Sequence, residues 1–257
     1  MGDDVVQFYQ QLTQDYHLIY ADWNKAIERQ SNALDRLIRT RTGGPPLDLL
    51  DCSCGIGTQA IGLAARGYHV HATDISPAAV ERAGHEAAAR GVTLTVGVAD
   101  FRRLPEVIEG TFDIVLSCDN ALAHLITDED LLLSARSMRA KVRPSGLLVV
   151  SISDYDRRIL NRLHATTPQV FDDPEGRRIV FQVWDWGEDD RVYTVSMFML
   201  REIEGTWRTA RYVTTCRAVL RAELSVILQQ AGFTDIRWHM PQDTGYHQPV
   251  VIARLGT

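Results

Sequence analysis

The stretch LLDCSCGIGT, residues 49–58, joins a short apolar run to two glycines and then to a helical pattern. The apolar run at 47–51 has the length of a buried strand and ends in Asp51. Gly55 and Gly57 lie in the turn that follows, where a missing Cβ lets the backbone approach a ligand closely. From Gln59 apolar residues recur at helical spacing and stop at Gly67. We therefore expect a ligand-binding turn between a strand and a helix.

The same alternation of strand and helix continues on the C-terminal side of this stretch. Strands are expected at 70–74, 94–98, 112–117 and 147–151, and helices at 77–90 and 128–141. The first of these helices opens with the N-cap and proline pair Ser76-Pro77, and the second ends at an Arg-Pro-Ser-Gly sequence, residues 143–146. This order predicts an α/β fold, a doubly wound, Rossmann-like and mostly parallel sheet with helices on both faces.

Two segments depart from the alternation and divide the chain. Residues 1–44 read as an N-terminal helical cap, which ends in a Gly-Gly-Pro-Pro loop. Residues 156–217 contain strand-like runs at 178–186, 192–203 and 207–216, which predict an inserted antiparallel β meander, a substrate-side lobe that acts as a lid. A helix at 218–231 and a strand pair at 233–239 and 250–254 complete one domain spanning 1–257.

Composition excludes several classes of protein. The 257 residues carry 27 Lys and Arg against 33 Asp and Glu, a net charge of −6, and 45% are hydrophobic. This is the composition of an ordinary globular chain, and its mild acidity argues against a nucleic-acid partner. No apolar run approaches the ~18 residues of a membrane span, and the first residues are acidic, so we expect a cytoplasmic protein without a membrane partner. The four cysteines have neither disulfide-scaffold nor metal-site spacing, and no metal is expected.

Polar residues follow successive strands at one edge of the predicted sheet. Asp51, Asp74, Asp100 and Asn120 each stand at or just past a strand end, so they should face one crevice. Asp74 is placed to accept hydrogen bonds from a ribose diol, and Asp51 suits a cationic amino group. Asp100 offers a carboxylate to an adenine amino group, and Phe101 offers a ring on which adenine can stack.

Two cofactors fit such a crevice. The pattern Gly-Ile-Gly-Thr-Gln-Ala at 55–60 matches the G-x-G-x-x-G/A fingerprint of dinucleotide sites, so a nicotinamide-dependent oxidoreductase is one alternative. However, Asp51 would repel a pyrophosphate. The amino-acid end, ribose and adenine of S-adenosyl-L-methionine meet the three acids in order, which favours this cofactor and its product S-adenosyl-L-homocysteine.

Residues 49–58 resemble the first motif of class I S-adenosylmethionine-dependent methyltransferases. Residues 15–20, 22–30, 118–125 and 154–156 resemble the glycine/sarcosine N-methyltransferase branch of that class. The resemblance implies that Arg29 holds the cofactor carboxylate and that Tyr20 and Trp23 lie over its methionine moiety. With the acids, the candidate cofactor-binding residues are Tyr20, Trp23, Arg29, Asp51, Gly55, Gly57, Asp74, Ile75, Asp100, Phe101 and Cys118.

For the acceptor side, the resemblance implies a small-molecule substrate bound near Asn120 and His124. The Asn120 amide could orient an amine, His124 could take the released proton, and Tyr20 completes the candidate catalytic set. Direct in-line transfer to nitrogen, an amine or N-heterocycle, is expected, with a natural-product O-methyltransferase as the alternative. Ser153 stands where the branch has the arginine that grips the substrate carboxylate, so glycine or sarcosine is not expected unless Arg157, Arg211 or Arg217 substitutes. The sequence is also compatible with a homo-oligomer.

Overall fold

A seven-stranded sheet forms the centre of the molecule. The structure, a computed structural model, describes residues 3–162, 164–173, 176–188 and 191–256, so parts of the predicted segments 1–44 and 156–217 lie outside the described residues. The strands are β1 (Asp48–Asp51), β2 (His69–Asp74), β3 (Thr95–Val98), β4 (Phe112–Ser117), β5 (Val142–Ser151), β10 (Phe233–His239) and β11 (Val250–Leu255).

The strands lie in the order β10-β11-β5-β4-β1-β2-β3. Successive strands are added on one side of β1 up to β3 and then on its other side from β4, so the strand order reverses between β1 and β4. Strands β1 to β5 pair in parallel, whereas β11 runs antiparallel to both β5 and β10. This arrangement confirms the predicted doubly wound, mostly parallel sheet. In such sheets the ligand crevice opens at the carboxyl ends of the two strands where the order reverses.

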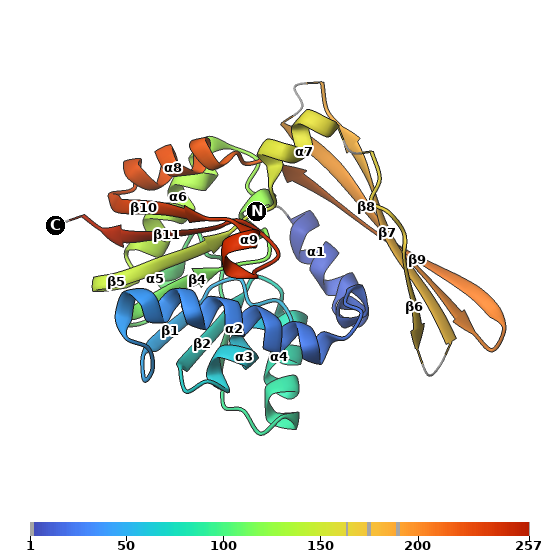
Figure 1. Ribbon diagram of the computed structural model, residues 1–257, viewed down its shortest axis with the longest axis horizontal. Coiled ribbons are helices and arrows are strands. Elements are labelled where there is room, and N and C mark those ends of the chain that lie inside the picture. Colours follow the sequence, from blue (N-terminus) through green and yellow to red (C-terminus); the bar gives the residue numbers. More distant parts are fainter. Residues whose placement is uncertain (1–2, 163, 174–175, 189–190, 257) are drawn as a thin grey trace.

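Helices cover both faces of the sheet, as Figure 1 shows. On one face lie α2 (Trp23–Thr42), α3 (Thr58–Ala64) and α4 (Pro77–Ala89), whose apolar residues pack with Leu49. On the other lie α5 (Leu104–Val107), α6 (Asp128–Arg139) and α8 (Arg221–Gln230), packed with Leu50. Consecutive residues of a strand point to opposite faces, so an uninterrupted apolar strand supplies both cores.

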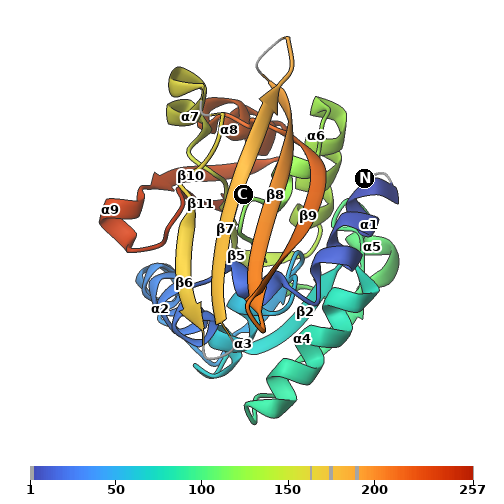
Figure 2. The ribbon, with the colours of Figure 1, turned by 90° about the vertical axis from the view of Figure 1, so that its right-hand side faces the viewer.

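A second, four-stranded antiparallel sheet stands apart from the first. It contains β6 (Gln169–Asp173), β7 (Gly176–Trp186), β8 (Val192–Ile203) and β9 (Thr206–Arg217), in that order, and its broad face is seen in Figure 2. The predicted meander corresponds to β7, β8 and β9. Strand β6 was missed because five residues, two of them acidic, carry little alternation.

The N-terminal segment lies between the two sheets (Figure 1). It consists of α1 (Asp3–Leu12) and the short helix η1 (Tyr16–Ile19), ahead of α2. Phe8 and Leu12 of α1 pack against Met197 and Tyr212 of the second sheet. The remaining short helices are η2 (Ala121–His124), α7 (Tyr155–Asn161) and α9 (Pro241–Thr244). Apolar contacts therefore hold α1 over the carboxyl ends of the main-sheet strands.

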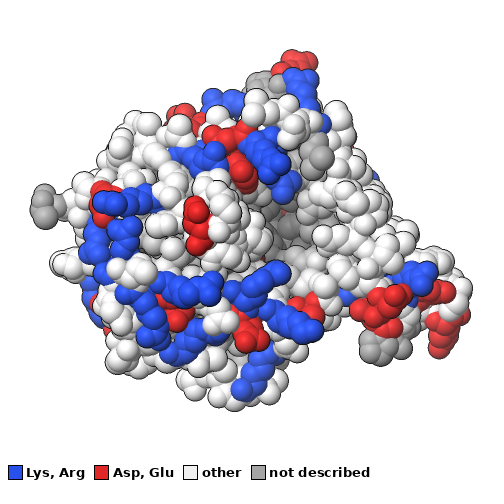
Figure 3. Space-filling view, in the orientation of Figure 1, with Lys and Arg blue, Asp and Glu red and all other residues white. Residues whose placement is uncertain are grey.

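The face of the molecule shown in Figure 3 is hollowed between the main sheet and the second sheet. Basic and acidic side chains are interspersed around this hollow, with Lys and Arg gathered along α2. Among the described residues, no helix has the length and apolar character needed to cross a bilayer.

Candidate active site

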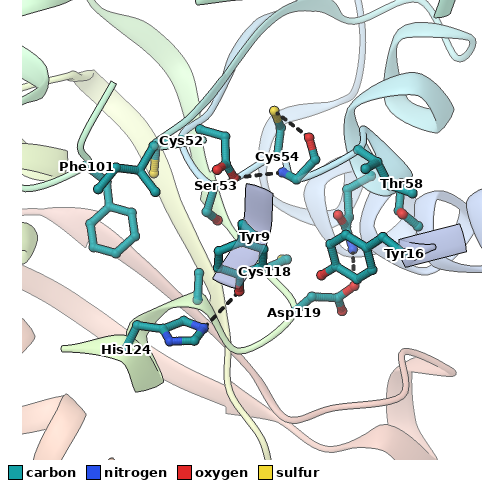
Figure 4. Close-up of a pocket in the computed structure, with 16 residues that line it drawn as sticks. Tyr9, Tyr16, Cys52, Ser53, Cys54, Thr58, Phe101, Cys118, Asp119 and His124 are labelled. Carbon is teal, nitrogen blue, oxygen red and sulfur yellow. Dashed lines mark hydrogen bonds between the residues drawn. The ribbon is translucent and has the colours of Figure 1, made fainter. Parts of the chain in front are cut away.

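A pocket of about 540 Å³ opens at the carboxyl ends of β1, β2 and β4, where the topology predicts a ligand. Five of the predicted cofactor residues line this pocket: Gly55, Asp74, Ile75, Phe101 and Cys118. Figure 4 shows Phe101 on one side and Tyr16 on the other, with the loop from Cys52 to Cys54 between them.

Asp74 shapes the glycine turn of this pocket. Its Oδ2 accepts a hydrogen bond from the backbone N–H of Gly55 at 2.9 Å, and its Oδ1 accepts one from Ser76 at 2.9 Å. Burial raises the pKa of Asp74, although these backbone hydrogen bonds oppose the rise. A carboxylate has about four acceptor positions, so Asp74 can still accept hydrogen bonds from a ligand.

Gly55 adopts a left-handed φ of 53°, and a Cβ there would lie 3.3 Å from Tyr16 Cε1. The turn therefore passes close beneath the Tyr16 ring, which forms part of the pocket wall. Gly57 does not line the pocket. It precedes α3 with φ 93°, and a Cβ there would meet Ile61 at 2.9 Å, so its role is in the turn and the helix packing.

Asp51 is buried at the end of β1 and does not itself line the pocket, but the three residues that follow it, Cys52 to Cys54, do. Its Oδ1 accepts a hydrogen bond from the Ser53 N–H at 3.3 Å, but its Oδ2 has no partner among the described residues. Burial, together with the nearby charges of Asp74 and Asp119, raises the pKa of Asp51 to about 8. A buried carboxylate with an unpartnered oxygen is a site that a cationic group can stabilise.

Two predicted cofactor residues, Arg29 and Asp100, line neither of the two pockets at this site. Arg29 is exposed on α2 and lines neither pocket, whereas its neighbour Gln30 is buried toward the site. Asp100 also lies outside the pocket lining, and Arg102 contacts both of its carboxylate oxygens, the shortest at 2.7 Å. Arg29 is on the exposed face of α2, and Asp100 is paired with Arg102. Neither the helix face nor the ion pair can be read from the motif.

Trp23 supports the pocket from behind. It is buried, and its Nε1 donates to Thr58 Oγ1 at 2.9 Å, while the guanidinium of Arg90 lies 4.8 Å from the ring centroid. Thr58 lines the pocket but Trp23 does not. Trp23 therefore contacts the pocket wall through Thr58 and does not face the position predicted for a methionine moiety.

A second pocket, of about 1040 Å³, adjoins the first. Both pockets share Tyr9, Tyr16, Asp119 and His124, so these four side chains form the border between them. The outer wall comes from α1 and from the second sheet, where Trp184 and Tyr193 stack with ring centroids 4.5 Å apart. Tyr20, predicted on both sides of the reaction, lines this second pocket.

Asp119 is the centre of a polar cluster at this border. Gln59, Tyr20 and Tyr246 donate hydrogen bonds to its carboxylate at 2.8, 3.3 and 2.9 Å, and His247 Nε2 lies 2.9 Å from Oδ1. Burial alone would raise the pKa of Asp119, but the charge and hydrogen bond of His247 and the other donors lower it below the ordinary value. The cluster therefore holds an ionised carboxylate between the two pockets.

The backbone at Asp119 and Asn120 is left-handed, with φ of 57° and 70°. Two consecutive non-glycine residues in this region are strained, and such strain concentrates at functional sites. Two signals could have identified Asp119: its position two residues after β4 and its place in the family-like segment 118–125. Gln59 lies in the glycine motif at 55–60, whereas Tyr9, Tyr246 and His247 come from distant segments that carry no motif.

Asn120 is bonded at both ends of its side-chain amide. Its Nδ2 donates to Tyr155 Oη at 2.7 Å, and its Oδ1 accepts from the Ser153 N–H at 2.9 Å. Asn120 lines the second pocket, yet these bonds assign its amide to holding the 153–155 segment. The expected contact of this amide with an amine is therefore not supported by its bonding.

His124 is buried at the border, and both of its ring nitrogens have protein neighbours. Nε2 lies 2.8 Å from the Tyr9 hydroxyl, a bond drawn in Figure 4, and Nδ1 lies 3.4 Å from Thr214 Oγ1. Burial lowers the pKa of His124 to about 4. The imidazole is therefore neutral near pH 7 and has a protein partner at each nitrogen.

Three arginines could substitute for the arginine expected at position 153, and they differ in their contacts. Arg217 pairs with Asp128 and Glu223, and Arg211 contacts Ser196. Arg157 lines only an outer cleft, while Arg158, which the sequence did not single out, lines the second pocket with its guanidinium 4.7 Å from the Trp184 centroid.

Comparisons with known proteins show what this chain is similar to. Residues 49–146 match the methyltransferase domain family. A glycine/sarcosine N-methyltransferase of Parasynechococcus marenigrum is 30% identical over 136 residues, which are 53% of this chain and 47% of that protein, so the match spans about half of the relative's length.

Solved structures share the fold over nearly the full chain. DesVI of Streptomyces venezuelae superimposes with a TM-score of 0.79 at 16% identity, covering 94% of this chain and 97% of that one. The amino pentose methyltransferase CalS10 of Micromonospora echinaspora gives a TM-score of 0.72 at 20% identity, covering 89% and 91%. Residues 49–146 therefore match a methyltransferase domain family, and the chain as a whole shares its fold with DesVI and the amino pentose methyltransferase CalS10.

Proposed function

We propose that this chain transfers a methyl group from S-adenosylmethionine to a nitrogen atom of a small molecule. The observation that carries the proposal is the pair of adjoining pockets, which share an ionised carboxylate, Asp119, at their border. The relatives support it, since those named above include a glycine/sarcosine N-methyltransferase and an amino pentose methyltransferase.

The first pocket fits the cofactor. Asp51 supplies an unpartnered buried carboxylate oxygen for the cationic amino group, and Asp74 supplies acceptors for the ribose. Phe101 supplies a buried aromatic ring for the adenine. When bound, S-adenosylmethionine supplies an electrophilic methyl group on a sulfonium ion.

The border residues favour positive charge on both sides. Asp119 attracts a sulfonium from the first pocket and stabilises the positive charge that develops on an amine nitrogen in the second as it is methylated. The faces of Tyr16 and Tyr20, which flank Asp119, stabilise cations electrostatically. A carboxylate at this position suits an amine more than a phenol, because a phenol must lose its proton and become an anion before attack.

The N-terminal helix and the second sheet exclude water from the border. Phe8 and Leu12 of α1 pack on Met197 and Tyr212, and Phe8, Leu12 and Met197 form an apolar wall of the second pocket. Exclusion of water keeps the nucleophile unsolvated and prevents methyl transfer to water. The fixed border residues hold the acceptor in line, which is the main catalytic requirement of a displacement.

Ligand binding tests the first pocket. S-adenosylhomocysteine at about 100 times its Kd should stabilise the fold by about 2.7 kcal/mol and raise Tm by roughly 5–10 °C, whereas NAD should not. Asp74→Asn should weaken S-adenosylhomocysteine binding by about tenfold or more, since it removes a charged acceptor. Asp48→Asn is the matched control, because Asp48 lies at the opposite end of β1 and pairs with Arg143. Stabilisation by NAD in place of S-adenosylhomocysteine would contradict the proposal.

Transfer of labelled methyl from S-adenosylmethionine tests the acceptor. A panel of tyramine, tyrosine, glucosamine, glucosamine 6-phosphate, histamine, sarcosine, p-cresol and catechol contains amines with and without an anionic group, and phenols. We expect label in amines, with N-methyl products identified by mass spectrometry. Label in p-cresol or catechol alone would show an O-methyltransferase instead.

A further inference from the structure

We propose that His247, oriented by Asp119, accepts the proton that the acceptor nitrogen releases when it is methylated. The proposal rests on the function proposed above and names a catalytic residue for it. His247 lies in the loop between α9 and β11, outside every motif found in the sequence.

The geometry of the pair fixes which nitrogen of His247 is a base. Nε2 lies 2.9 Å from Asp119 Oδ1, and an ionised carboxylate can only accept, so Nε2 carries the proton. The neutral ring then has its lone pair on Nδ1. The same arrangement, a carboxylate that holds the tautomer and stabilises the imidazolium, operates in Asp-His pairs of hydrolases.

Asp119 is itself held firmly enough to orient the ring. Gln59 and Tyr246 donate to its two oxygens at 2.8 and 2.9 Å, and its backbone N–H donates to Ser151 Oγ at 2.9 Å. Because Asp119 lines both pockets, His247 is one side chain away from the cofactor pocket. The dyad is therefore at the border where acceptor and donor must meet.

His247 also has a route for the proton to leave. It lines the second pocket and the outer cleft, and its side chain is 37% exposed. The titratable and charged groups around it are Asp119 after β4, Tyr20 before α2, Tyr246 beside it, Arg158 of α7 across the pocket, and Asp154 and Arg157 in the outer cleft. A proton taken up at Nδ1 can pass to water through the cleft.

His124, the base expected from the sequence, is less suited to this step. Its Nε2 is bonded to Tyr9, its Nδ1 faces Thr214, and burial lowers its pKa to about 4. It can hold Tyr9 at the border and position α1. It is also far more buried than His247, since only 8% of His124 is exposed.

The step balances without a further reactant. The nitrogen lone pair forms a bond to the methyl carbon as the carbon–sulfur bond breaks, and that electron pair stays on sulfur as a neutral thioether. The nitrogen becomes a methylammonium, and its N–H proton moves to Nδ1 of His247. The resulting imidazolium lies against the Asp119 carboxylate and later loses its proton to solvent.

The kinetic test compares wild type, His247→Ala and His247→Gln with the amine of the panel that wild type methylates fastest. We expect kcat to fall by about 10²–10⁴-fold, the usual contribution of general base catalysis, with S-adenosylhomocysteine affinity within about twofold of wild type. Added imidazole should restore activity to His247→Ala but not to His247→Gln, whose side chain fills the site. The control is His69→Ala, because His69 lies at the far edge of β2 and contacts Asp48.

Two readouts separate proton transfer from a merely structural role. The acid limb of the pH profile of kcat, present in wild type, should be lost in His247→Ala and return with imidazole. In the S-adenosylhomocysteine complex, long-range ¹H–¹⁵N correlation should show His247 as the Nε2–H tautomer, and Asp119→Asn should mix the tautomers.

A His247→Ala enzyme with wild-type kcat, or an inactive one that imidazole does not rescue although S-adenosylhomocysteine binds, would overturn the proposal. An Nδ1–H tautomer in the wild-type complex would also overturn it. Wild type that methylates nothing in the panel would instead overturn the proposed function itself.

Discussion

Replacement of Asp51 by asparagine should make the affinity for the cofactor nearly independent of pH. Asp51 is 1% exposed, one of its oxygens has no partner among the described residues, and burial raises its pKa to about 8. The free protein therefore holds this carboxyl mostly protonated at pH 7. A ligand that brings a cationic amino group to the unpartnered oxygen stabilises the ionised form, so binding must release a proton.

The size of the effect follows from that pKa. With a pKa of about 8, roughly one molecule in eleven has an ionised Asp51 at pH 7, and about half at pH 8. S-adenosylhomocysteine affinity should therefore rise about tenfold from pH 6 to pH 7 and about fivefold from pH 7 to pH 8. Binding at pH 7 should release about 0.9 proton per ligand.

The same pKa predicts the stability of the free protein. Because the folded pKa is raised from 3.8 to about 8, the contribution of Asp51 to stability is fully present below pH 3.8 and is lost as pH rises through 8. At pH 7 the loss is at most about 4 kcal/mol, from about 3.2 pH units at 1.36 kcal/mol each. Asp51→Asn removes the carboxyl, so it should stabilise the free protein at pH 7 while weakening ligand binding.

Isothermal titration with S-adenosylhomocysteine at about pH 6, 7 and 8, in buffers of different ionisation enthalpy, measures both affinity and proton release. Asp51→Asn should bind weakly with little pH dependence. The control Asp48→Asn should behave as wild type, because Asp48 is partly exposed and paired with Arg143. An affinity for wild type that does not change from pH 6 to pH 8, with no proton released, would refute the reasoning.

Three further predictions follow from side-chain placement. Arg29→Ala should leave S-adenosylhomocysteine affinity within about twofold of wild type, because Arg29 is exposed outside the pocket; calorimetry that finds a tenfold loss would restore the role implied by the family resemblance. Arg158→Gln should raise KM for glucosamine 6-phosphate about tenfold more than for glucosamine, since a guanidinium that stacks on Trp184 can bind an anionic group; equal changes for both substrates would count against it. His124 has a folded pKa lowered to about 4, so it contributes up to about 3 kcal/mol of stability that is present above pH 6.5 and lost as pH falls through 4. Urea unfolding at about pH 7 and pH 4.5 should therefore show a smaller acid loss in His124→Gln, and an unchanged loss would exclude His124 as its source.

The periodicity of the chain was sufficient to predict the main sheet. Short apolar runs, glycine turns and helix caps are local features, and Ser76 does cap α4 through Ala79 with Pro77 in the first helical position. The order of these elements also placed Asp51 and Asp74 at one edge, because parallel strands have their carboxyl ends together. The pocket at that edge follows from topology alone.

Only the tertiary structure decided which side chains meet there. The rotation of α2 buries Gln30 and exposes Arg29, and the pairing of Arg102 with Asp100 withdraws a carboxylate that strand position alone had placed in the crevice. The Asp119 cluster joins Gln59 of α3 to His247, 188 positions later in the chain. Local sequence fixes periodicity and turns, but helix rotation, ion-pair partners and the convergence of loops are set by long-range packing, so they cannot be derived from any one segment.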